Sequence, residues 1–135
     1  MSRSAFPAPE LTRFAICLIL AFLMLPLRAD ERESFFENEI RPLLIENCLE
    51  CHSEETERSG NLGLDSAQGW RNGGDLGPAI VAGEPDQSLL IKAIRYDERD
   101  LEMPPEGKLP AQAIQAFEKW VREGAVDPRT AASGT

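Results

Sequence analysis

Two of the three cysteines in this 135-residue chain and its only histidine stand together in five residues, Cys48-Leu49-Glu50-Cys51-His52. The remaining cysteine, Cys17, lies far upstream in an apolar run. Thiols and imidazoles bind metals, react covalently or, for thiols, pair as disulfides. The fold must therefore place these three side chains where one of those chemistries is possible.

The spacing of this pentapeptide is the C-x-x-C-H pattern of covalent haem c attachment. Two thiols about one helical turn apart can each add to one of the two haem vinyl groups, and the adjacent imidazole can then bond the iron. The pattern predicts one covalent haem c, with Cys48, Cys51 and His52 as cofactor-binding residues and His52 as an iron ligand.

Three other interpretations of the cysteines stay open. A structural zinc site needs four ligands, and no further Cys or His follows residue 52. A thioredoxin-like dithiol is expected beside a βαβ pattern, but no run of β-branched residues flanks the motif. A disulfide between Cys48 and Cys51 would close a very short loop and would stabilise the chain little. Haem attachment is the interpretation we favour.

Residues 1–29 have the pattern of a secretory signal peptide. Arg3 and Arg13 precede an apolar run from Phe14 to Leu27, and the small residue Ala29 follows it. The run of 14 residues is short of the roughly 20 that a spanning helix needs. Bulky Ile16 before Cys17 disfavours lipid attachment. We expect cleavage near Ala29 and export to the periplasm or cell envelope, with no membrane span in the mature chain.

The charge of the mature chain restricts its partners. The whole sequence has 14 basic and 23 acidic residues, and the leader holds three Arg and one Glu, which leaves a net charge of about −11. Nucleic acid is excluded as a partner because phosphate binding needs clustered Lys and Arg. A basic or cationic partner protein fits this charge. The 42% of apolar residues is typical of a globular chain.

Hydrophobic periodicity predicts helices on both sides of a glycine-rich segment. A capping box at Ser34 to Glu37 predicts a helix start, and Pro42 predicts a kink or break within the helical pattern that follows. A later helix, capped by Asp86 or Ser88, should end near Tyr96, and the last should run from Pro110 to Gly124. The expected buried stripes are Phe36, Ile40, Leu43 and Leu44, then Leu89, Leu90, Ala93 and Ile94, then Ile114, Phe117, Trp120 and Val121.

Seven glycines lie between Gly60 and Gly83 and divide this stretch into turns. A flexible surface loop would leave the apolar residues among them exposed to solvent. We expect an ordered wrap around a flat apolar group, because Gly lets the backbone approach a ligand closely. The apolar residues are Leu62, Leu64, Trp70, Leu76, Ile80 and Val81.

Met103 is the predicted sixth iron ligand. It is the only methionine after the leader, it follows His52 by 51 residues, and two prolines stiffen the backbone beyond it. A thioether ligand raises the reduction potential of a haem. The second imidazole nitrogen of His52 needs an acceptor, for which the Gly77-Pro78 carbonyls are candidates. Candidate donors to the haem propionates are Trp70, Arg71, Arg95 and Tyr96.

The ordered motifs resemble the Planctomycete-type cytochrome c domain, a relative of class I c-type cytochromes, from about Phe35 to Ala125. The resemblance implies an all-α haem fold of about four helices with a Gly-rich loop, with His52 proximal and Met103 distal to the iron. We therefore expect a signal peptide at 1–29, a cytochrome c-like haem domain at 30–126 and a flexible tail at 127–135. The matching segments are Ile40–Leu44, Cys48–His52, Leu62–Ser66, Gly73-Gly74, Gly77–Val81, Gly83–Pro85, Ser88–Leu90, Met103–Pro105 and Trp120–Ala125.

The expected function is electron transport by an exported monohaem cytochrome, not an enzyme. A peroxidase-like activity lacks a distal histidine to act as a base, because His52 is the only one. A binding or anchoring module that haem merely stabilises is the other alternative. It differs from an electron carrier in exchanging electrons poorly with small mediators.

Overall fold

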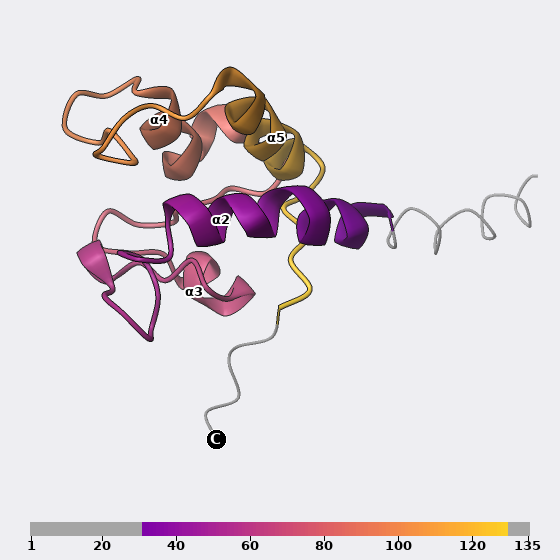
Figure 1. Cartoon of the computed structure of the whole chain (residues 1–135), viewed down its shortest axis with the longest axis horizontal. Coiled ribbons are helices and arrows are strands. Elements are labelled where there is room, and N and C mark those ends of the chain that lie inside the picture. Colours follow the sequence, from indigo (N-terminus) through magenta and orange to yellow (C-terminus); the bar gives the residue numbers. More distant parts are fainter. Residues whose placement is uncertain (1–30, 130–135) are drawn as a thin grey trace, which may run out of the picture. The chain divides into compact units, whose positions relative to one another are not determined.

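The computed structural model describes residues 31–129, and within this range the chain is helical and forms no β-strand (Figure 1). The four α-helices confirm the predicted all-α fold. The signal peptide predicted at 1–29 lies outside the described residues. The helices are α2 (Arg41–Asn47), α3 (Ala67–Asn72), α4 (Leu89–Arg95) and α5 (Ala111–Arg122), with shorter turns η1 (Phe36–Ile40), η2 (Ser59–Asn61) and η3 (Pro85–Gln87).

The first helical segment runs without a break from residue 31 through the π-helical turn η1 into α2. Pro42 has no N–H to donate, and the helix widens in the turn before it, where the Arg41 N–H bonds to the Phe36 carbonyl five residues back. Of the predicted kink or break at Pro42, the break is therefore absent and the helix is continuous with a local π turn. Ser34 lies inside the helix and does not cap it, so the predicted helix start is also wrong.

Trp120 lies at the centre of the core. Its ring centroid is 5.7 Å from that of Phe36, 6.1 Å from Trp70 and 6.4 Å from Phe117. These rings come from η1, α3 and α5, so one aromatic cluster joins segments far apart in the sequence. In Figure 1, α2 runs between α3 on one side and the α4 and α5 pair on the other.

The glycine-rich segment buries Leu64, Trp70 and Ile80 as expected, but Leu76 is 71% exposed and Val81 37%, which corrects the prediction for those two residues. The segment also contains the helix α3, which its composition hides. The Ser66 hydroxyl caps α3 by accepting from the Gly69 N–H at 3.0 Å. Gly69 weakens the helical pattern, yet the packing requires it, because a Cβ there would lie 2.7 Å from the Gly63 carbonyl oxygen. Gly73 has a positive φ of 74°, and a Cβ there would lie 2.3 Å from the Gly77 oxygen.

The two later helices confirm the predicted boundaries within one or two residues. Every residue in the predicted stripe of α5 is buried. At α4 the predicted capping bond is absent, because the Ser88 hydroxyl bonds instead to the Val81 and Glu84 backbone while Asp86 pairs with Arg95. None of the helices among residues 31–129 is long and apolar enough to cross a membrane.

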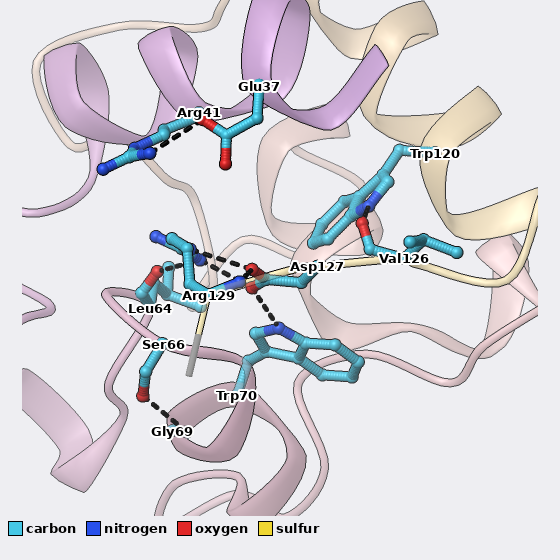
Figure 2. A network of polar contacts seen from close by, with 10 residues as sticks. All are labelled: Glu37, Arg41, Leu64, Ser66, Gly69, Trp70, Trp120, Val126, Asp127 and Arg129. Carbon is cyan, nitrogen blue, oxygen red and sulfur yellow. Dashed lines mark hydrogen bonds and ion pairs between the residues drawn. The ribbon is translucent and has the colours of Figure 1, made fainter. Parts of the chain in front are cut away.

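Residues 127–129 pack against the domain, which corrects the predicted start of a flexible tail (Figure 2). The buried carboxylate of Asp127 accepts a 3.0 Å hydrogen bond from the Trp70 indole and pairs with Arg129 at 2.8 Å. Arg129 also donates to the Leu64 carbonyl oxygen at 2.9 Å, and its guanidinium lies 4.9 Å from the Phe36 ring centroid. The sequence pattern missed this anchor because all its partners are distant in the chain.

Candidate cofactor site

The Cys48–His52 pentapeptide forms a tight turn at the end of α2. The N–H groups of Cys51 and His52 both donate to the Cys48 carbonyl, at 3.2 and 2.9 Å. The turn is also pinned to the glycine-rich segment, because the His52 carbonyl accepts from the Leu64 N–H at 2.7 Å. The backbone therefore fixes where the two thiols and the imidazole leave the chain.

The four predicted site residues line a single cavity of about 740 Å³. Cys48, Cys51 and His52 contribute to its wall from the turn after α2, and Met103 contributes from the segment after α4. A cavity of this size is ample for a small-molecule cofactor. The rest of the lining is mainly apolar and includes Leu62, Leu64, Ala79, Leu90, Ala93, Ile94 and Leu101.

The imidazole of His52 has a buried nitrogen without a protein partner. Its Nδ1 atom is inaccessible to solvent and makes no hydrogen bond to the described residues. The predicted acceptor region does not supply one: the Gly77 carbonyl accepts from the Gly74 N–H at 3.1 Å instead. A buried unpaired nitrogen is costly, so this ring is suited to a further binding partner.

Burial raises the pKa of the Cys48 thiol to about 12. Thiol–disulfide oxidoreductases require the opposite shift, because their reactive cysteine is a thiolate near neutral pH. Both cysteines are free in the structure. The environment of Cys48 therefore argues against the thioredoxin-like alternative. No group of three or more His, Cys, Asp or Glu side chains gathers as a metal site within residues 31–129.

Met103 is held at the cavity by backbone contacts to α4. Its N–H donates to the Ala93 carbonyl at 3.2 Å, and the next residue, Pro104, accepts a hydrogen bond from the Tyr96 hydroxyl. Met103 is 37% exposed. Its thioether therefore lies at the cavity wall without being enclosed by other protein groups.

The four predicted propionate donors do not line this cavity. Trp70 donates to Asp127, Arg71 stacks on the Trp70 ring, and Arg95 pairs with Asp86 and Glu118. Tyr96 donates to Pro104, as described above. These side chains already interact with other groups of the protein outside the cavity, which corrects the prediction that they donate to the haem propionates.

Lys108 is the only basic side chain among the described residues that line the cavity. Sequence reasoning missed it, since an exposed lysine carries no local signal and only the folded chain brings it here. Four acidic side chains share the lining, and all four belong to exposed residues: Glu46, Glu50, Asp75 and Glu106. The cavity therefore has an apolar interior and a rim rich in carboxylates.

These residues fit a c-type haem. Two thiols, an imidazole with an unpaired buried nitrogen and a thioether line a single, mainly apolar cavity. The thiols are the groups that attach haem covalently, while imidazole and thioether are established axial ligands of haem iron. This fold and donor set resemble those of a small cytochrome c-like domain.

The family comparison supports the same class. Residues 48–107 match the model of the family described as Planctomycete cytochrome C, which confirms the resemblance drawn from the motifs. The matched segment contains Cys48, Cys51, His52 and Met103. No curated protein and no solved structure gave a significant match to the chain.

Proposed function

We propose that this protein is an exported monohaem c-type cytochrome that carries single electrons. In this proposal one haem c is bound covalently through Cys48 and Cys51, with His52 and Met103 as axial ligands. The observation that carries the proposal is the shared cavity, which the fold lines with all four side chains although Met103 follows His52 by 51 positions in the sequence.

The haem supplies one-electron redox chemistry when bound. The chain binds, orients and shields it. The turn after α2 presents two tethering sulfurs and one ligand nitrogen, and the segment after α4 presents the thioether. Apolar side chains such as Leu64, Leu90 and Ile94 exclude water from the cavity. A thioether ligand and a dry pocket both favour a higher reduction potential.

The acidic rim supports a basic redox partner. Carboxylates outnumber basic groups four to one among the charged residues that line the cavity. With about −11 on the mature chain, this distribution attracts a cationic partner to the opening through which electrons would pass. Such steering raises the association rate, and dissolved salt screens it.

The proposal is tested by producing the full chain with its leader in a host that attaches haem c. We expect a coloured protein whose haem stays with the polypeptide on a denaturing gel and adds the mass of one haem. The double variant Cys48→Ser/Cys51→Ser should lose this covalent haem. Glu50→Gln, which changes the motif but keeps both thiols and the imidazole, should keep it.

Two outcomes would contradict the proposal. Colourless protein, with Cys48 and Cys51 either free or paired with each other, would show that no haem is attached. A coloured holoprotein that exchanges electrons with small mediators only very slowly would instead support the alternative of a binding or anchoring module that haem stabilises.

A further inference from the structure

Tyr96 ends α4 in a conformation that favours glycine. Its backbone is left-handed, with φ 60° and ψ 38°, and its N–H donates to the Ala93 carbonyl at 3.2 Å. A residue with a Cβ is disfavoured in this region, where helices commonly use Gly. A tyrosine at this position therefore indicates that its side chain has a use beyond ending the helix.

That side chain reaches the segment that carries Met103. The Tyr96 hydroxyl donates to the Pro104 carbonyl, one residue beyond Met103. The Ala93 carbonyl, which bonds the Tyr96 N–H, also accepts the Met103 N–H at 3.2 Å. Two contacts on consecutive residues therefore join the Met103 segment to the last turn of α4.

The intervening loop has one backbone contact to α4 at its start, where the Asp97 N–H donates to the Lys92 carbonyl at 3.1 Å. Residues 97–100 are all exposed. Their ion pairs to α4 are long and exposed, at 3.9 Å for Lys92–Glu98 and 4.0 Å for Arg95–Asp97. Exposed pairs of this kind contribute little to stability. Beyond Asp97, the contacts at Ala93 and Tyr96 are therefore the main hydrogen bonds that attach the Met103 segment to α4.

We propose that Tyr96 is a positioning residue that holds Met103 at the cavity through the Pro104 carbonyl. It thereby sets how readily an external ligand displaces the thioether from the iron. This inference rests on the proposed function, since it takes Met103 to be the sixth ligand. Tyr96 itself touches neither the haem nor the iron in this proposal.

The test uses the ferric holoprotein and imidazole as the competing ligand. Tyr96→Phe keeps the ring but removes the hydroxyl that bonds Pro104. A hydrogen bond of typical strength corresponds to about a fivefold change in an equilibrium constant. We therefore expect imidazole to bind about fivefold more tightly to the variant, with loss of the thioether–iron absorption band at lower imidazole concentration. The Met103 amide should also exchange its hydrogen faster.

Ser88→Ala provides the matched control, because it removes one hydroxyl at the opposite end of the same helix, where Ser88 bonds Val81 and Glu84. It should leave imidazole affinity unchanged. If the control raises the affinity as much as Tyr96→Phe does, the effect is general loosening and the positioning role is wrong. An affinity for Tyr96→Phe within the error of the parent protein also overturns it.

Tyr96→Gly separates positioning from helix termination. Glycine suits the left-handed backbone, so the helix end should persist while the side-chain contact is lost. We expect imidazole affinity at least as high as in Tyr96→Phe, and a parent-like affinity would show that Tyr96 only ends the helix. Met103→Ala completes the set: an unchanged spectrum in that variant would reject the proposed ligation itself, independently of Tyr96.

Discussion

Cys48 and Cys51 differ in environment although only two residues separate them. Cys51 is exposed, whereas Cys48 lies against the core and burial raises its pKa to about 12. The Cys48 thiol therefore remains protonated at neutral pH and packs as a small apolar group. Before haem attachment, the turn presents one accessible and one shielded sulfur.

This difference predicts unequal alkylation in protein produced without haem. At pH 7.5, iodoacetamide should modify Cys51 faster than Cys48 by about tenfold or more, because the thiolate is the nucleophile and Cys48 has little of it. Raising the pH from 7 to 9 should leave Cys48 almost unreactive, since its pKa is still well above that range. Peptide mass spectrometry measures both rates.

Urea-unfolded protein is the control for this prediction. There the two thiols should react at similar rates, because the burial that separates them is lost. Equal rates in the folded protein would mean that Cys48 is accessible and that the described turn does not shield it.

At the level of elements, the segment 127–129 shows how a short tail can act as part of the core. Asp127 joins Trp70 of α3 to Arg129, and Arg129 donates to the backbone of Leu64 (Figure 2). The Arg129 guanidinium also lies against the ring of Phe36. The Asp127 side chain is fully buried and that of Arg129 is 10% exposed. Water cannot replace either partner if one is lost.

Asp127→Asn should therefore lower the free energy of unfolding by about 3 kcal/mol, because it leaves the buried charge of Arg129 without its counter-ion. Urea denaturation followed by circular dichroism measures this change. Asp86→Asn is the matched control: Asp86 also pairs with an arginine at 2.8 Å but is 82% exposed, so its loss should cost under about 1 kcal/mol. Similar costs for both variants would contradict the role given to burial.

The glycine-rich wrap allows a second test at this scale. Gly73 and Gly77 both have positive φ, at 74° and 100°, but only Gly73 has atoms within 4 Å of an added Cβ. Gly73→Ala should lower the free energy of unfolding more than Gly77→Ala does, by at least about 1 kcal/mol, because it adds a clash to the same backbone strain. Equal losses in urea denaturation would mean that the Gly73–Gly77 contact is not close.

At the scale of the whole molecule, we expect the rate of electron transfer with charged reagents to depend on the charge around the cavity and not on the net charge alone. The oxidised holoprotein should accept electrons from hexaammineruthenium(II), a cation, more slowly as salt rises. Transfer from the reduced holoprotein to the anion ferricyanide should accelerate, because salt screens repulsion in that case. Stopped-flow absorbance at low and high salt measures both trends.

Two variants with the same change in net charge locate the effect. Glu106 lines the cavity and Glu123 does not, so Glu106→Gln should slow the reaction with the cation more than Glu123→Gln does. Equal effects would mean that the net charge of the protein attracts the cation and that the position of Glu106 does not matter. Rates that do not vary with salt would remove electrostatic docking from the proposed function.

Local sequence patterns predicted α4 and α5, because helical periodicity and helix-end residues act within a few residues of one another. The turn glycines, which also act locally, predicted that the glycine-rich segment folds into defined turns. Local patterns were insufficient at the first helix, where the segment before Ser34 continues the helix and a π turn accommodates Pro42. They also missed α3, whose central Gly69 is required by contact with Gly63. In these cases packing overrides propensity.

From residue type and spacing alone, the sequence predicts haem attachment at the C-x-x-C-H motif and Met103 as the remaining thioether. The all-α class followed from the family resemblance together with the helical periodicity. Only the tertiary structure decided that the four predicted site residues line one cavity, that Lys108 joins them and that the expected propionate donors do not. It alone revealed the Asp127–Arg129 anchor and the Tyr96–Pro104 contact. Such contacts depend on distances between residues remote in the chain, which folding sets and local spacing does not encode.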